Sequence, residues 1–528
     1  MSFVNHPLIK EGALQSRVYQ ETMLAEAVKK NVLCVLPTGM GKTPIAIMLV
    51  AIMLEKKPKQ KILIMAPTKP LVAQHYETFM GKLNIDEGRL VFITGNINPE
   101  KRGLIYDEHD IIFATPQTIS NDLKTGKLSL KNFSLAVFDE AHHAIGGYAY
   151  PFVSKTYFEQ SEDPKILALT ASPGGTREKI DEICQNLGIE AVEIKTEKDA
   201  DVREWTQEKK FEWDVVELPP SFRRLHEIIA KSYRNALVKV SAIGFRKPLD
   251  YVTKGDLLAM QGRIFGESKS GKKVFWQSFI VARAIKLDHA LSLIETQSLK
   301  ALADYWKKIR TEEKNRASKM ILKDPEILRA MQITHEMMEK GYNHPKMGKL
   351  LSLVETSIRE KPQLKIIIFV SLRSTVKQIV EMLEKVDDIK PVEFIGQKEG
   401  MTQKEQLQRL KDFREGKYNT IVATSVGEEG LDIPAMDLAI FYEPVPSEIR
   451  SIQRRGRVGR HDVGRVIFLI TKGTRDEGYY WASRKKEKVM KRTLHRMKNG
   501  DQSEEIFEDE KLEKELKKPK QFRISDFK

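Results

Sequence analysis

The sequence has few cysteines and no long apolar segment. Its 528 residues include two cysteines, Cys34 and Cys184, which lack the paired spacing of a disulfide framework or a structural zinc site. We expect both to be buried thiols in a reducing compartment. The longest apolar run, residues 45–54, is about half the length needed to cross a bilayer. Residues 1–11 lack the apolar stretch of a secretory signal, so the sequence predicts a soluble intracellular protein.

The composition is that of a globular protein with a basic excess. With 41% apolar and 30% charged residues, the chain has enough material for several cores, and its length predicts about three domains. The 88 lysines and arginines outnumber the 73 acidic residues, which leaves a net charge of +15. Such an excess favours a polyanionic partner, either nucleic acid or an anionic membrane surface.

Two regions alternate short apolar runs with helical stretches, from residue 31 to about 200 and again after residue 344. Apolar runs of this kind, such as residues 32–36 and 419–425, are typical of parallel strands buried on both faces. Between the two regions, long amphipathic helices dominate, and residues 203–340 carry 27 basic against 18 acidic residues. The sequence therefore predicts two α/β domains (1–202 and 344–490), a basic helical insertion (203–343) and a charged, disordered tail (491–528). A further basic helical stretch, residues 484–500, spans the boundary between the second domain and the tail.

The first candidate site is a phosphate loop between the run 32–36 and an apolar helix. Glycines let successive backbone N–H groups surround phosphate oxygens, and the helix N-terminus adds partial positive charge. Lys42 would reach the β and γ phosphates of ATP, and the Thr43 hydroxyl would bind Mg²⁺. Leu36 stands where the general pattern has glycine. The loop consists of Pro37, Thr38, Gly39, Met40, Gly41, Lys42 and Thr43.

A second candidate feature is the acidic pair Asp139 and Glu140, which ends another buried run. Two adjacent charges at that place are costly unless they have a function. About a hundred residues beyond a phosphate loop, Asp139 is placed to bind Mg²⁺. Glu140 is then expected to orient and deprotonate the attacking water.

These motifs resemble those of superfamily-2 helicases. PTGMGKT, DEAH and, in the second half, QRRGRVGR (453–460) carry the resemblance, which extends along most of the chain. It implies two RecA-like doubly wound parallel sheets with the helical insertion between them, and ATP and Mg²⁺ as cofactors. It also implies that Arg17 and Gln20, in RVYQ, recognise adenine. By the same resemblance, segments of both halves line a nucleic-acid track, at Thr68, Lys69, Thr94, Gly95, Thr115, Ser371, Arg373 and Thr424.

The second half would complete the ATP site from the opposite wall of an interdomain cleft. Arg457 and Arg460 are three residues apart, so on a helix they face the same way and can clamp a transferring phosphoryl group. The resemblance implies that Gln453 senses the γ-phosphate and that Asp432 lies near the ribose. Contacts of this kind to the nucleic-acid backbone are independent of base sequence.

A helical insertion between two such domains resembles the subgroup that contains Dicer, the RIG-I-like RNA sensors, archaeal Hef and Fanconi anaemia M translocases. IGQKEGMTQKEQ (395–406) and ATSVGEEGLDIP (423–434) look most like the Hef branch. The insertion would then be a thumb for branched DNA. Aromatic Tyr251, Phe275 and Trp276 could stack on bases, and the phosphate contacts would come from Arg246, Lys247, Lys254, Arg263, Lys269, Lys272 and Lys273.

The leading prediction is an ATP-driven motor on forked or four-way DNA, acting in replication-fork repair. An RNA-stimulated ATPase of the RIG-I or Dicer kind, and a branch-point scaffold without enzymatic activity, remain the alternatives. The chain lacks the ERK-centred motif of the nuclease domain found in Hef-like proteins, so we expect it not to cut DNA. The end of the tail, residues 521–527, faintly resembles a sliding-clamp-binding peptide.

Overall fold

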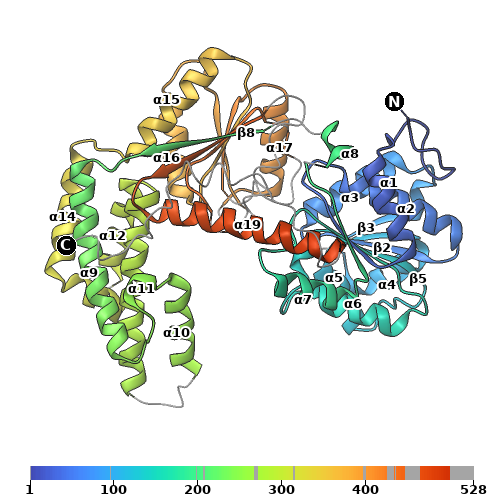
Figure 1. The fold of residues 1–528 in the computed structure, drawn as a ribbon, viewed down its shortest axis with the longest axis horizontal. Helices are drawn as coiled ribbons and strands as arrows, with labels where there is room; N and C mark the ends of the chain where they lie inside the picture. Colours follow the sequence, from blue (N-terminus) through green and yellow to red (C-terminus); the bar gives the residue numbers. More distant parts are fainter. Residues whose placement is uncertain are drawn as a thin grey trace.

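Two α/β domains and a helical bundle make up the protein, shown as a computed structural model in Figure 1. None of the helices in the described ranges combines the length and the apolar character that a membrane crossing requires. The structure describes residues 2–95, 97–197, 199–205, 209–266, 272–312, 315–396, 400–424, 433–434, 436–445, 447 and 464–499.

The first domain is a seven-stranded parallel sheet with helices packed on both faces. Its central strands are buried along their whole length, as their uninterrupted apolar runs predict. Cys34 is buried in β1, whereas Cys184 on α7 is only partly buried, contrary to expectation. In sheet order the strands are β3 (Leu90–Ile93), β4 (Ile111–Ala114), β2 (Lys61–Met65), β5 (Phe133–Phe138), β6 (Ile166–Thr170), β1 (Val32–Val35) and β7 (Ala191–Ile194). The helices are α1 (Val18–Lys29), α2 (Lys42–Lys56), α3 (Lys69–Lys82), α4 (Pro99–Glu108), α5 (Pro116–Lys124), α6 (Ala149–Gln160), α7 (Arg177–Leu187) and α8 (Ala200–Arg203), with 3-10 turns η1 (Glu87–Arg89) and η2 (Ala141–His143).

The second domain is built around a six-stranded parallel sheet. Its central strands are again fully buried and apolar. The order is β10 (Pro391–Phe394), β11 (Thr420–Ala423), β9 (Ile366–Phe369), β12 (Leu438–Phe441), β13 (Gly464–Thr471) and β8 (Lys209–Val216), with helices α15 (Pro345–Glu360), α16 (Arg373–Leu383) and α17 (Gln403–Arg414). Two parallel α/β domains, with a helical domain between them in the order of the chain, confirm the predicted fold class. In space the helical bundle lies at one end of the molecule, beside the second domain (Figure 1).

Strand β8 differs from the sequence prediction, which placed residues 209–216 in the helical insertion. It pairs in parallel with β13 along its whole length and forms an edge of the second sheet. As an edge strand it is only partly buried, so it lacks the continuous apolar run by which the other strands were found. Phe211 and Trp213 nevertheless pack against the core of the second domain.

The insertion is a bundle of amphipathic helices whose apolar faces meet in one core, which includes Phe222, Leu287 and Trp306. The pairing of α10 with α11 forms its distal end in Figure 1, away from both sheets. The helices are α9 (Pro220–Ala242), α10 (Lys254–Gly266), α11 (Lys272–Thr296), α12 (Leu299–Thr311), α13 (Arg316–Leu322) and α14 (Pro325–Glu339), with a 3-10 turn η3 (Leu249–Tyr251).

The last described helix, α19 (Arg475–Asn499), leaves the second domain and ends against the first (Figure 1). The sequence prediction ended the second domain at residue 490 and gave residues 484–500 as a further helical stretch; the helix does continue to Asn499, and Leu494 on it is fully buried. Leu494 packs into the first domain, so the apolar contact that extends the helix comes from another domain. Residues 500–528, including the clamp-like peptide, lie outside the described part of the chain.

Candidate active site

The phosphate loop connects the end of β1 to the start of α2. Gly39 and Gly41 have φ of +86° and +82°, a left-handed backbone that glycine adopts without steric cost. A Cβ on Gly41 would lie 2.3 Å from Gln20 Nε2, so the loop also needs a glycine for close packing. Lys42 Nζ donates to the Leu36 carbonyl at 3.3 Å, which holds the lysine over the loop. The glycines therefore shape a turn ahead of a helix N-terminus, a geometry that suits a phosphate group.

Residues of helix α1 hydrogen-bond to this loop. Tyr19 donates its hydroxyl to the Met40 carbonyl at 2.7 Å, and the Gln20 amide donates to the Met40 and Gly41 carbonyls at 3.2 Å each. Arg17 bonds to the Tyr19 hydroxyl at 3.0 Å and stacks on the Trp205 ring at 4.6 Å. The predicted adenine-recognition residues are thus adjacent to the loop, and the Gln20 amide N–H group contacts the loop itself. Tyr19 lies in the RVYQ element, but sequence reasoning assigned it no role and did not identify Trp205.

Asp139 lies directly after β5 and is 6% exposed. Its carboxylate bonds to His75 Nε2 at 2.7 Å. Burial alone would raise the pKa of Asp139, but the His75 hydrogen bond, the charge of Lys42 and the Glu140 N–H together lower it below its ordinary value. The carboxylate is therefore held ionised beside the phosphate loop.

His75 is a residue of this site that sequence reasoning missed. It lies on α3 between Val72 and Phe79, in the stripe of positions that this helix buries. A polar side chain on an otherwise apolar helix face was the available signal, because such a side chain needs a buried hydrogen-bond partner. The partner is the predicted Mg²⁺ ligand Asp139.

Glu140 has a left-handed backbone, with φ of +49°, which is uncommon for a residue other than glycine. Its carboxylate oxygen Oε2 is buried and has no hydrogen-bond partner within the described ranges, although His142 Nδ1 lies 3.3 Å away. His142 Nδ1 is also 3.2 Å from the hydroxyl of Thr170, at the end of β6. Strained backbone and an unsatisfied carboxylate oxygen are typical of functional sites.

The donor set fits a magnesium nucleotide. The Thr43 side chain is partly exposed in the first turn of α2, and the Asp139 carboxylate, whose pKa His75 and then Lys42 lower, lies within reach of the Lys42 charge. A hydroxyl and a carboxylate are hard oxygen ligands of the kind that Mg²⁺ uses beside substrate phosphates.

The predicted track residues of the first domain follow three neighbouring strands of its sheet. Thr68 comes after β2, Thr94 and Gly95 after β3, and Thr115 after β4, so all four lie at the carboxyl edge. Thr68 and Thr115 are also the N-cap residues of α3 and α5, and Lys69 is the first residue of α3. Helix N-termini present free N–H groups, which are suitable donors for phosphates.

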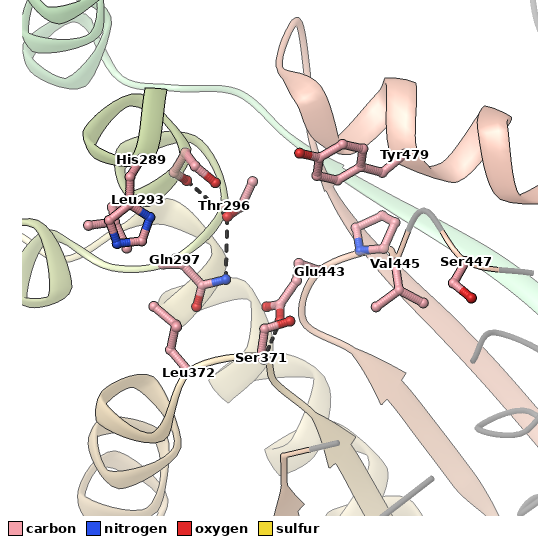
Figure 2. Close-up of a pocket in the computed structure, with 12 residues that line it drawn as sticks. His289, Leu293, Thr296, Gln297, Ser371, Leu372, Glu443, Val445, Ser447 and Tyr479 are labelled. Atoms are coloured by element: carbon pink, nitrogen blue, oxygen red, sulfur yellow. Dashed lines mark hydrogen bonds between the residues drawn. The ribbon is translucent and has the colours of Figure 1, made fainter. Parts of the chain in front are cut away.

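In the second domain, Ser371 and Arg373 follow β9 and Thr424 follows the adjacent strand β11. The Ser371 N–H donates to the buried carboxylate of Glu443, beside a cavity of about 240 Å³ between the insertion and the second sheet (Figure 2). Helix α11 and Tyr479 of α19 also line this cavity. The predicted track residues of this domain thus also share the carboxyl edge of one sheet.

Several predicted site residues lie outside the described ranges: Asp432, Gln453, Arg457, Arg460 and Lys269, together with the side chains of Lys272, Lys273 and Phe275. Within the insertion, Arg246, Lys247 and Arg263 line one hollow, and Lys247 pairs with Asp256 at 2.6 Å. The Lys254 side chain is exposed at the start of α10. The Tyr251 and Trp276 side chains are 43% and 55% exposed, respectively.

Three segments of the chain match known families. Residues 12–175 match the res subunit of type III restriction enzymes, residues 221–341 match the helical bundle of ATP-dependent RNA helicases, and residues 345–462 match the helicase conserved C-terminal domain. With the phosphate loop in the first of these segments, this arrangement defines a superfamily-2 helicase, a class that binds ATP.

Individual relatives narrow the class. The crystal structure of the Pyrococcus furiosus Hef helicase domain is similar, with a TM-score of 0.69 and 44% identity, over 90% of this chain and 100% of that one. The chain accordingly belongs to the Hef-type helicases, the superfamily-2 group related to Fanconi anaemia M, which confirms the resemblance seen in the sequence.

Two curated relatives extend beyond the aligned region. A Methanocaldococcus jannaschii protein described as an ATP-dependent RNA helicase is 41% identical over 94% of this chain and 63% of its own length. The ATP-dependent DNA helicase mph1 of Neurospora crassa is 31% identical over 88% of this chain and 41% of its own length. This chain therefore spans less than two thirds of each.

Proposed function

We propose that this chain hydrolyses ATP to move along a nucleic-acid backbone and that it prefers branched DNA, such as forks and four-way junctions. One observation carries the proposal. The phosphate loop, the acidic pair and the first-domain track residues all follow strands of the same parallel sheet at its carboxyl edge. A change at the nucleotide can therefore reach the predicted track through a single layer of loops, and carboxyl edges are where open α/β sheets bind ligands.

In the proposed reaction, the loop N–H groups and Lys42 hold the β and γ phosphates. Mg²⁺, held by Thr43 and Asp139, would neutralise charge that develops on the transferring phosphoryl group. Glu140 accepts a proton from water as the water oxygen bonds to the γ-phosphorus. The bond between that phosphorus and the β–γ bridging oxygen breaks, which releases ADP and phosphate.

The second domain would supply the other half of the site. Arg457, Arg460 and Gln453 are proposed from the sequence to contact the γ-phosphate across the cleft, with Asp432 at the ribose. Closure of the domains would then require ATP, and hydrolysis would release it. If each domain grips the backbone through its own carboxyl edge, repeated closing and opening would produce movement along the strand.

Branched DNA is proposed because the insertion provides a basic, partly aromatic surface at the distal end of the bundle, separate from both sheets. Such a surface suits the backbone of a second arm of the substrate. Duplex RNA is the second candidate, because one relative is described as an RNA helicase and the bundle matches a family from RNA helicases.

The experiment that tests the proposal measures ATP hydrolysis by the purified chain with single-stranded, duplex, forked and four-way DNA and with duplex RNA. We expect the largest stimulation with the branched DNAs. Glu140→Gln should lower turnover roughly a hundredfold or more while ATP still binds, because only the proton acceptor is lost. Glu159→Gln, on the exposed face of α6, is the matched control. Undiminished turnover in Glu140→Gln would contradict the assigned role, and greater stimulation by RNA would favour the second candidate.

A further inference from the structure

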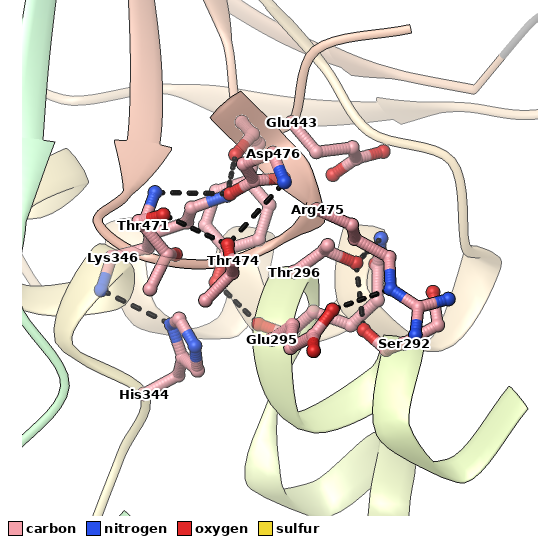
Figure 3. Close-up of polar contacts among 12 residues, drawn as sticks. Ser292, Glu295, Thr296, His344, Lys346, Glu443, Thr471, Thr474, Arg475 and Asp476 are labelled. Carbon is pink, nitrogen blue, oxygen red and sulfur yellow. Dashed lines mark hydrogen bonds and ion pairs between the residues drawn. The ribbon is translucent and has the colours of Figure 1, made fainter. Parts of the chain in front are cut away.

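Helix α19 begins in a buried polar junction that joins the second domain to the insertion (Figure 3). Arg475 contacts Glu295 and, at 3.3 Å, Asp288, both on α11 of the insertion. Asp476 pairs with Lys346 of α15 and accepts the Thr471 N–H at 3.0 Å. Because removing one member of a buried ion pair is strongly destabilising, the start of α19 should move together with the second domain and the insertion.

The other end of α19 packs into the first domain. Met490 is 3% exposed and Leu494 is fully buried, in the core cluster that also contains Val192 and Ile194 of β7. Met490 is also in polar contact, because the Ser172 hydroxyl donates to its sulfur at 2.9 Å. The side chains that this end buries in the first domain, Met490 and Leu494, are apolar, and apolar surfaces are less directional than ion pairs. If the distance between the domains changes, we therefore expect this end of α19 to shift.

Ser172 belongs to the turn after β6, and Thr170 at the start of this turn contacts His142, two residues beyond Glu140. The Ser172 N–H donates to the Thr170 hydroxyl at 3.2 Å, and that hydroxyl donates back to the Ser172 carbonyl at 3.2 Å. The same hydroxyl lies 3.2 Å from His142 Nδ1, which lies 3.3 Å from Glu140. Three hydrogen bonds, and then a 3.3 Å approach of His142 Nδ1 to Glu140 Oε2 that is not itself a hydrogen bond, thus connect Met490 to Glu140.

We propose that Met490 is a positioning residue for ATP hydrolysis. Through Ser172, Thr170 and His142 it sets the position of Glu140, and through α19 it links that position to the placement of the second domain and the insertion. The inference rests on the proposed ATPase function. It adds a connection, through α19, by which the second domain and the insertion can affect Glu140 without contacting the nucleotide. Densely packed contacts switch between discrete arrangements rather than deform smoothly, so a small shift of the helix can change how Glu140 is held.

The test compares Met490→Ala, Met490→Leu and, as a matched control, Val489→Ala, whose side chain is 39% exposed one position away. In Met490→Ala at saturating forked DNA, we expect kcat for ATP to fall about tenfold, as misplaced catalytic groups do, while KM for ATP stays within about twofold. The affinity for forked DNA should not change. Met490→Leu, which fills a similar volume, should recover most of kcat, and Val489→Ala should match the unmodified chain.

The thermal midpoint of each variant is measured, and activity is assayed well below the lowest midpoint. If Met490→Ala does not fold, the smaller truncation Met490→Val carries the same comparison. Unchanged kcat in the folded variant, or a parallel rise in KM, would overturn the inference. If the unmodified chain itself hydrolyses no ATP, the proposed function fails; if it does and Met490→Ala equals it, only this inference fails.

Discussion

Replacing Lys346 by methionine should destabilise the protein where α15 of the second domain packs against the start of α19. Lys346 and Asp476 are both fully buried and form an ion pair. Lys346 also donates to the Tyr442 carbonyl at 2.9 Å. Burial raises the pKa of Asp476 above its ordinary value, even though Lys346 and the Thr471 N–H both lower it. The carboxylate therefore already carries a desolvation cost, and Lys346→Met would remove its only described cationic partner.

The expected loss of stability follows from the burial of this ion pair. Removing one partner of a buried ion pair costs about 3–5 kcal/mol, whereas replacing both partners by apolar residues is often neutral. At a few degrees per kcal/mol for a unit of this size, we expect Lys346→Met to lower the unfolding midpoint by roughly 10 °C. The double variant Lys346→Met with Asp476→Leu should regain most of that loss.

Differential scanning calorimetry of the full chain would measure these midpoints. Lys349→Met is the matched control, because Lys349 lies one turn along α15, is 40% exposed and pairs with Asp214 at 3.0 Å. An exposed pair of this kind contributes about 0–1 kcal/mol. An unfolding temperature for Lys346→Met equal to that of the control, or a double variant as unstable as the single one, would contradict the predicted cost of the unpaired carboxylate.

Two further predictions concern buried histidines. His75→Ala removes the hydrogen bond that orients Asp139. The Mg²⁺ concentration for half-maximal binding of an ATP analogue, measured by titration calorimetry, should therefore rise about tenfold or more. An unchanged Mg²⁺ requirement would argue against this role of His75. Burial, aided by the charge of Lys346, lowers the pKa of His344 to about 3. Below about pH 6.5 the unfolded chain therefore takes up a proton that the folded chain does not, and stability should fall by about 1.4 kcal/mol per pH unit, down toward pH 3. His344→Gln should flatten this slope in pH-dependent denaturation, whereas His335→Gln, 73% exposed, should leave it in place.

Elements with strong local signals could be predicted from the amino-acid sequence. The central strands appear as uninterrupted apolar runs because strands buried on both faces admit few polar side chains. The phosphate loop could be predicted from Gly39 and Gly41, because a tight turn before a helix depends on neighbouring residues. The helical insertion could be predicted from the helical spacing of its apolar residues. Strand β8 was missed because an edge strand is partly exposed and its partner β13 lies far along the chain.

Which distant residues meet could be seen only in the folded protein. Nothing near His75 in the sequence indicates Asp139, and nothing near Met490 indicates Ser172, because each pair is brought together by packing between separate elements. Likewise, Lys346 and Asp476 look like ordinary surface charges until α15 and α19 bury them against each other. Local patterns determine what a segment can form, whereas partners follow from the packing of whole faces, which no short stretch of sequence encodes.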